Sequence, residues 1–212
     1  MATASQSLFN MTVAGDNAGG NQGLLMPKLQ YRFRVNFLNF GVDAAGGLAL
    51  TKQVMDVTRP NLSFDEVTLN VYNSRIYLAG KHTWSEITVN IRDDASGTVS
   101  RAVGQQLQKQ LDFVEQASAA TGQDYKFQTN IEVLDGGNGT AAPVVLETWE
   151  CYGCFLKTAN YQSLNYATSD AATIALTIRY DNAIQSPLTS GVGQSIGRIL
   201  AGESSTGIGA AT

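Results

Sequence analysis

The chain is dominated by an alternation of apolar and polar residues with a period of two. The segment KLQYRFRVNFLNF shows it most clearly, because Leu29, Tyr31, Phe33, Val35 and Phe37 share one face and the residues between them are polar. Successive side chains of a β-strand point to opposite faces of a sheet, so such a segment is expected to be half buried. The sequence therefore predicts a long early strand here.

The same alternation returns along most of the chain. Residues 63–73 and 75–81 are expected to form two strands of a hairpin, joined around Asn73-Ser74. Further strands are expected at five other places, and a break is expected within the fourth of them, at Gly153. Their ranges are 49–57, 84–93, 125–135, 144–158 and 171–183. Six to eight strands are thus predicted.

One segment has helical periodicity instead. Residues 98–118 are expected to form a helix that packs on its own sheet. Ser96 or Thr98 is expected to cap its N-terminus, and Asp93 and Asp94 suit the positive end of the helix dipole. The apolar residues of the expected stripe are Val99, Val103, Leu107, Leu111 and Val114.

Both ends of the chain differ from the middle in composition. Residues 1–24 and 188–212 are rich in Gly, Ala, Ser and Thr, as is typical of arms and not of a core. The sequence therefore predicts an N-terminal arm, one domain over 25–187 and a C-terminal arm. Its fold class is expected to be mainly β, an antiparallel β-sandwich or barrel with one flanking α-helix and no internal repeat.

Composition narrows the class of partner. Only 15% of the 212 residues are charged, against about 25% in typical soluble domains. Two explanations stay open: copies of the same chain cover the surface, or uncharged polar groups form it. The net charge is −4 and Lys and Arg form no cluster, which argues against tight nucleic-acid binding. No apolar run approaches the ~20 residues of a membrane span, and the start of the chain lacks a secretory pattern, so folding is expected in the cytosol without membrane anchoring.

No residue pattern predicts catalysis or a cofactor. Cys151 and Cys154 form a C-x-x-C pair, but on a strand they point to opposite faces unless Gly153 forms a bulge, so two buried structural thiols are expected. A zinc site is not expected, because the chain has one histidine, His82, and no further cysteine. His82 also lacks a nucleophile-elbow pattern nearby. We therefore expect no catalytic, cofactor-binding or metal site, and no enzyme.

Several patches, taken in order, resemble the tail tube proteins of contractile-tailed bacteriophages. They are YRFRVNF in the early strand, VTRP before a strand that begins SF, WSEITVNIRDD leading into a helix, and ETWE leading through GCFLKT to IRYDNA. Together they span about residues 27–184. No single patch is diagnostic, but their order and spacing are characteristic. Phage-like bacteriocins and type VI secretion systems contain related tubes.

The resemblance implies a structural subunit of a virion tail. Copies would form hexameric rings that stack into a rigid tube inside a sheath, assembled in the host cytoplasm. The expected partners are therefore the chain itself, the tail sheath protein, and the baseplate and tube terminator proteins. DNA would pass through the lumen during genome ejection without tight binding. The payload, genome or toxin, is not fixed by the fold.

Two sets of residues are expected to serve this role. The hairpin 64–81 is the candidate contact between stacked rings, because aromatic residues and arginine are favoured at interfaces. Its candidate residues are Phe64, Tyr72, Arg75, Tyr77 and Lys81. The polar faces of two strands are the candidate lumen wall, through Glu86, Thr88, Asn90, Thr173 and Thr177. The helix is expected on the outside, where Gln105, Gln108 and Lys109 could face another subunit.

Two other functions stay open. The same fold serves related tail components, such as a tube initiator, a tube terminator or a baseplate hub. A ligand-binding β-sandwich is the alternative from another class, with Trp84 and Trp149 stacking a carbohydrate. Homopolymerisation separates these hypotheses, because a terminator stops at one ring and a binding module stays small.

Overall fold

The computed structural model describes residues 28–42, 44–135, 143–167, 169–187 and 191–193. Residues 1–32 and 33–212 form two compact units, and all the described helices and strands belong to the second. The predicted arms at 1–24 and 188–212 lie outside the described residues, apart from 191–193. The boundaries of the central domain therefore stay a prediction.

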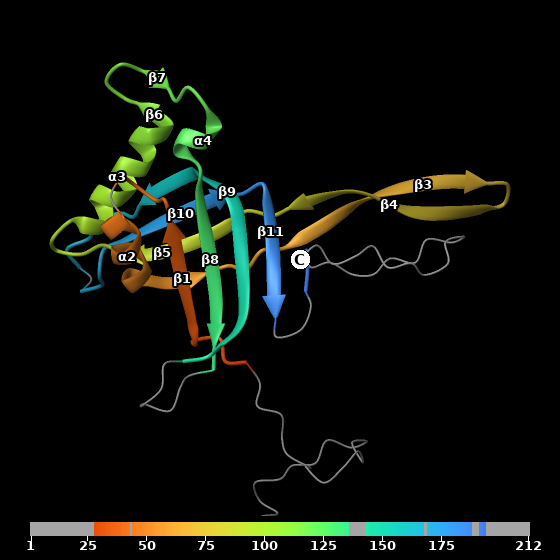
Figure 1. The fold of residues 1–212 in the computed structure, drawn as a ribbon, viewed down its shortest axis with the longest axis horizontal. Coiled ribbons are helices and arrows are strands. Elements are labelled where there is room, and N and C mark those ends of the chain that lie inside the picture. The colour runs from red at the N-terminus through yellow and green to blue at the C-terminus, as the bar shows by residue number, and fades with distance from the viewer. Residues whose placement is uncertain (1–27, 43, 136–142, 168, 188–190, 194–212) are drawn as a thin grey trace, which may run out of the picture. The chain divides into compact units, whose positions relative to one another are not determined.

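Antiparallel strands make up most of the described chain (Figure 1). The early strand is shorter than predicted, because the N–H of Arg32 donates to the carbonyl of Leu29 and closes a turn before it. The strands are β1 (Phe33–Leu38), β2 (Val54–Val57), β3 (Leu62–Val71), β4 (Ser74–Trp84), β5 (Ile87–Arg92), β6 (Leu111–Asp112), β7 (Ala117–Ser118), β8 (Phe127–Leu134), β9 (Val145–Tyr161), β10 (Thr173–Arg179) and β11 (Asn182–Pro187). The helices are α2 (Ala44–Gln53), α3 (Thr98–Gln110) and α4 (Gly122–Tyr125).

A single long strand, β9, joins two sheets. The strand order is β1-β8-β9-β10-β5-β2, and β11 also pairs with β9. The first part of β9 pairs with β8 and β11, whereas its last part pairs with β10. Every one of these pairings is antiparallel. The predicted class, a mainly β antiparallel sandwich with a flanking helix, is therefore confirmed.

The change of sheet occurs at Gly153, where φ is +65°. Between the pairs Phe127–Cys154 and Thr129–Cys151, β8 advances by two residues and β9 by three, so the ladder has a bulge. Asp181, between β10 and β11, lies against this bend and donates its N–H to the carbonyl of Tyr152. The predicted break at Gly153 is thus a bend within one continuous strand.

The inner faces of the sheets form the hydrophobic core together with α2 and α3. The core contains the residues that the alternation assigns to the inner faces of β5, β8 and β10. Among its members are Val35, Phe37, Ile87, Val89, Ile91, Phe127, Ile131, Ile174, Leu176 and Ile178. The inward faces of these strands were therefore predictable from the sequence.

The helix α2 corrects one prediction. Residues 49–57 were expected to form a strand, but α2 runs to Gln53 and only Val54–Val57 is extended. A side chain at Gly47 would place its Cβ 2.5 Å from the carbonyl oxygen of Phe37, so the helix lies directly against β1. Leu50 is fully buried there. A short apolar run does not distinguish a buried helix from a strand, and packing on β1 selects the helix.

The helix α3 is shorter than the predicted 98–118. It ends at Gln110, because the side chain of Asp112 accepts hydrogen bonds from the N–H groups of Val114 and Glu115 and forms a tight turn. These bonds lower the pKa of Asp112. The chain then forms the small hairpin β6–β7. Leu111 and Val114 consequently leave the predicted stripe and are exposed.

The N-terminus of α3 also differs from the prediction. Gly97 is the N-cap residue, with φ of +67°, and neither Ser96 nor Thr98 caps the helix. The carboxylate of Asp94 accepts the N–H of Val99 instead. Hydrogen bonds from Ser96 and Val99 lower the pKa of Asp94. The segments α4 and β11 were not predicted from the sequence.

Candidate functional sites: a two-faced hairpin, a polar sheet face and a terminal hollow

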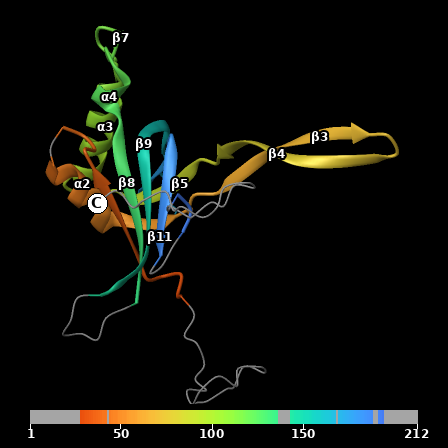
Figure 2. The same cartoon turned by 45° about the vertical axis from the view of Figure 1, so that its right-hand side comes forward.

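The hairpin β3–β4 extends away from the sheets (Figures 1 and 2). Its strands pair from Leu62 opposite Trp84 to Val71 opposite Ser74, with a two-residue turn at Tyr72-Asn73. The predicted hairpin is confirmed, but its turn lies one residue earlier than the expected Asn73-Ser74, because Ser74 is already paired with Val71. A register shift between Phe64 and Glu66 marks a bulge in β4 near Gly80. No residue of β3 is buried, and only Trp84 is buried in β4.

The two faces of the outer hairpin differ in chemistry. Beyond the bulge, cross-strand partners share a face, so one face carries only aliphatic side chains apart from Ser74 at the turn. Each of these side chains is 45–49% exposed, although aliphatic side chains of this size are usually buried. We call this set the aliphatic ridge: Val67, Leu69, Val71, Ile76 and Leu78. The other face carries Glu66, Thr68, Asn70, Arg75 and Tyr77.

The five predicted contact residues are distributed over the hairpin. Phe64, Arg75 and Tyr77 belong to the polar face, Tyr72 lies at the turn, and Lys81 lies at the bulge. All five are exposed. The sequence-based choice thus selected aromatic and charged residues and left out the aliphatic ridge. The signal for the ridge was present, because the alternation V-T-L-N-V in β3 matches I-Y-L in β4.

Aromatic rings attach the base of the hairpin to the core. The Phe64 and His82 rings are 6.4 Å apart, and the His82 and Trp84 rings are also 6.4 Å apart. The Trp84 ring is 5.8 Å from that of Tyr180, which is buried. Trp84 therefore anchors the hairpin. Both Trp84 and Trp149 lie in the core, so neither presents an open face for stacking a carbohydrate.

The predicted lumen residues lie on one polar sheet face. Thr88 is paired with Thr177, and Thr177 is paired with Thr158 of β9. The N–H of Thr88 donates to the hydroxyl of Thr58, so a row of four threonines crosses four adjacent chain segments. Thr173 and Asn90 lie on the same face, opposite Arg92 and Ala175 respectively. The structure therefore brings the candidate lumen residues of β5 and β10 together.

Charged groups gather at one end of this polar face. The carboxylate of Glu86 lies 2.5 Å from the ammonium of Lys157 and 3.9 Å from the guanidinium of Arg179. All three side chains are partly exposed, so the pairs contribute little to stability. The row of four threonines beside this end is uncharged, and two further charged residues lie on the same face: Asp56, which accepts a hydrogen bond from the side-chain amide of Asn90, and Arg92 opposite Thr173.

The C-x-x-C pair forms a buried thiol site. Cys151 and Cys154 are both fully buried and free, and the Sγ of Cys154 lies 3.2 Å from the carbonyl of Cys151. Both point inward because the bulge at Gly153 shifts the alternation by one residue. Burial raises the pKa of Cys154 to about 11 and raises that of Cys151 further. The prediction of two buried structural thiols is confirmed.

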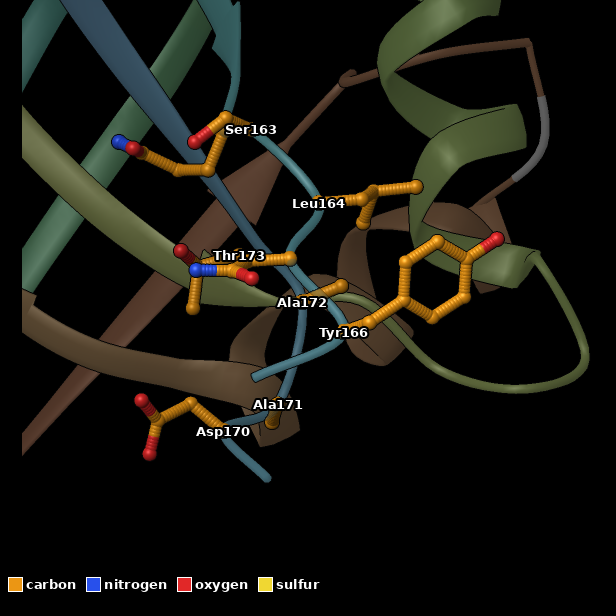
Figure 3. A pocket seen from close by; sticks show the side chains of 9 residues that line it. Ser163, Leu164, Tyr166, Asp170, Ala171, Ala172 and Thr173 are labelled. Atoms are coloured by element: carbon orange, nitrogen blue, oxygen red, sulfur yellow. The ribbon is translucent and has the colours of Figure 1, made fainter. Parts of the chain in front are cut away.

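A hollow of about 400 Å³ lies in the connection between β9 and β10 (Figure 3). Leu164 and Tyr166 extend to the same side of this loop, and both are almost completely exposed. Ala171 and Ala172 form the returning part, and the carbonyl of Ala172 accepts the N–H of Asp93 at the end of β5. We call this the terminal hollow. No periodic signal in the sequence indicates it, because it is a loop.

Other kinds of site find no support in the described part of the chain. Within it, no group of three or more His, Cys, Asp or Glu side chains is placed to hold a metal ion. No described helix is long and apolar enough to cross a membrane. The predicted contact residues Gln105 and Lys109 lie on α3, where Gln105 accepts the N–H of Val42 and Lys109 donates to the carbonyl of Asn39. Gln108 is exposed on the same helix.

No protein-family model and no curated protein matches the sequence. Solved structures do match the fold. A chain of the anti-feeding prophage baseplate superimposes with a TM-score of 0.57 at 11% identity, covering 78% of this chain and 99% of that chain. A chain of the anti-feeding prophage tube-terminating cap gives 0.56 at 13% identity, covering 82% and 99%. A chain of the sheath–tube complex of an extracellular contractile injection system, PVC, gives 0.54 at 16% identity, covering 76% and 92%. The chain therefore has the fold of subunits found in contractile injection systems, as its resemblance to tail tube proteins predicted.

Proposed function

We propose that the chain is a structural subunit of a contractile tail, which polymerises as stacked hexameric rings into the inner tube. The observation that carries this proposal is the aliphatic ridge. Five half-exposed aliphatic side chains stand on a ribbon of two strands, which is marginally stable alone in water. Contiguous apolar surface of this kind marks a contact with another protein. The fold shared with a chain of a sheath–tube complex indicates which kind of contact.

The proposal gives a role to each set of residues predicted from the sequence. The hairpin, with Phe64, Tyr72, Arg75, Tyr77 and Lys81, makes the contact between rings. The polar face of β5 and β10 lines the lumen, where uncharged threonine rows let a polyanion pass without binding. The tail sheath protein and the baseplate would contact the outside of the tube. In a phage tail this lumen would carry the genome, whereas the fold alone leaves genome and toxin open as payloads.

A second structural function has its own support. The chain matches a baseplate chain and a cap chain at TM-scores similar to that of the sheath–tube chain. It could therefore serve as a tube initiator or terminator in few copies. In either case the chain acts through assembly and not as an enzyme.

Negative-stain electron microscopy of the purified full chain, over a range of concentrations, tests the proposal. Hollow tubes of uniform diameter that lengthen with concentration are the expected result. Single rings that do not stack would favour the terminator. A field of monomers at all concentrations, confirmed by sedimentation velocity, would overturn self-assembly as the function.

A further inference from the structure

Three charged side chains from adjacent segments meet at one end of the polar sheet face. Glu86 directly precedes β5, Arg179 ends β10, and Lys157 lies in the second half of β9. The pairing of Ile87 with Ile178 sets Glu86 opposite Arg179 in the ladder. We call Glu86, Lys157 and Arg179 the charge cluster.

A bulge in β9 brings Lys157 onto this face. Between the pairs Thr177–Thr158 and Ile178–Leu156, β10 advances by one residue and β9 by two, so Lys157 is the extra residue. Leu156 is buried, whereas Lys157 and Thr158 are both exposed. Bulges commonly redirect a side chain in this way. Strict alternation would put Lys157 and Thr158 on opposite faces, so the bulge is what brings the ammonium and the threonine row onto the same face.

A single carboxylate serves both cations of the charge cluster. An oxygen of Glu86 lies 2.5 Å from the ammonium of Lys157 and 3.9 Å from the guanidinium of Arg179. The side chains of these two cations are 53% and 37% exposed, so a phosphate group in solution can reach them. Lysine and arginine bind phosphates through charge-assisted hydrogen bonds, and here the carboxylate already accepts that contact.

The carboxylate also sets the net charge of the cluster. With Glu86 the cluster has two cations and one anion, and without it the two cations would stand alone. The two further charged residues on this face, Asp56 and Arg92, are opposite in sign. The charge cluster therefore decides how strongly this face attracts a polyanion.

We propose that Glu86 is the residue that keeps the polar sheet face from retaining a polyanion, because its carboxylate competes with phosphate for Lys157 and Arg179. This inference rests on the proposed function, in which that face lines the lumen. A long phosphodiester chain would meet the charge cluster of one copy after another along a tube, so even a weak contact would multiply. The neighbouring threonine row offers hydroxyl groups without charge and adds no comparable attraction.

Glu86→Gln tests this role, since the amide keeps the size of the side chain and removes its charge. The probe is a fluorescein-labelled DNA duplex of about 40 base pairs, on which several copies can sit. It is titrated with the dilute full chain at about 50 mM salt and followed by fluorescence anisotropy. The variant is expected to bind at least about tenfold more tightly than the wild type, and the difference is expected to vanish by about 200 mM salt, because phosphate contacts weaken steeply with salt.

Two matched variants show whether the local cations carry the effect. Glu66→Gln removes the same charge from the hairpin, where Glu66 accepts a hydrogen bond from Thr68, and it is expected to bind DNA as the wild type does. Glu86→Gln combined with Lys157→Gln removes the ammonium as well, and its affinity is expected to return to that of the wild type. Circular dichroism checks that every variant is folded.

The outcomes separate the role of Glu86 from the proposed function. A gain in Glu86→Gln that Lys157→Gln reverses supports the role. The absence of a gain, an equal gain in Glu66→Gln, or a wild type that binds as tightly as Glu86→Gln would each overturn it. Electron microscopy of the same proteins tests the tube independently, because monomers at all concentrations would overturn the proposed function whatever the DNA titration gives.

Discussion

The strands β8 and β3 have the same sequence pattern and opposite surroundings. In β8 every second residue is buried, from Phe127 to Val133. In β3 the alternation V-T-L-N-V is equally regular, but none of its residues is buried. The difference arises because β8 lies in a sheet that packs against a second layer, whereas β3 pairs only with β4. Alternation therefore states which residues share a face, and whether that face is covered depends on a packing partner, which none of the described residues provides for β3.

The largest expected effect is the loss of stability when a leucine of the packed sheets is truncated to alanine, and the same truncation on the hairpin is the comparison. Leu176→Ala in β10 removes a fully buried side chain and is expected to lower the free energy of unfolding by about 2–5 kcal/mol. Leu69→Ala on the ridge is expected to change it by at most about 0.5 kcal/mol in dilute monomer. Urea denaturation followed by circular dichroism measures both. Equal losses would mean that the hairpin is covered within one copy.

The buried thiols of Cys151 and Cys154 make the free energy of unfolding of the packed sheets depend on pH. Burial raises the pKa of Cys154 from 9.0 to about 11, so the folded state holds this proton where the unfolded state has lost it. Its contribution to stability is complete below pH 9 and is lost as the pH rises to about 11. The expected loss is up to about 3 kcal/mol.

Urea titrations between about pH 8 and pH 11 of the wild type and of Cys154→Ala measure this contribution. The variant is expected to show a smaller decline, since Cys151 and Tyr180, whose pKa values are also raised by burial, still titrate. Identical slopes in the two proteins would contradict the assignment.

The next prediction concerns the bend of β9 at Gly153, which lies in the packed sheets and not in the hairpin. Gly153→Ala requires a Cβ at a φ of +65° and 2.1 Å from the carboxylate of Asp181, which also binds Lys126 at 2.5 Å. We expect a loss of about 1–3 kcal/mol in thermal or urea unfolding. Gly104→Ala is the matched control, because Gly104 lies in α3 with open space around it. That change is expected to stabilise by about 0.5–1 kcal/mol.

The smallest effect on folding is expected on the hairpin itself. Arg75→Glu and Ile76→Glu change adjacent residues on opposite faces, and each should alter monomer stability by at most about 0.5 kcal/mol. Both should shorten the assemblies seen by electron microscopy, Ile76→Glu far more than Arg75→Glu, because it puts a charge into an apolar contact. If Ile76→Glu gave assemblies of normal length, the aliphatic ridge would not be part of the contact. If Arg75→Glu did so, Arg75 would not be part of it.

Several elements were beyond prediction from pattern alone. The segment 49–53 became part of α2 because it packs against β1, where Gly47 permits close approach. The local turn around Asp112 ends α3 at Gln110, and a distant contact holds that end in place. The side chain of Gln110 bonds both the N–H and the carbonyl of Leu156, on an edge of β9 where no described strand pairs. Such contacts join residues far apart in the sequence, and no local period records them.

The two-faced strands, the hairpin 63–81 and the inward residues of β5, β8 and β10 followed from the sequence alone, because a strand has a fixed period of two. The exact turn did not, since it lies at Tyr72-Asn73 and was expected at Asn73-Ser74. The structural character of a C-x-x-C pair on a strand followed in the same way. Two features needed the packed chain: both thiols point inward, and Trp84 anchors the hairpin. They depend on the bulge at Gly153 and on the order of strands, which arise when distant segments pack.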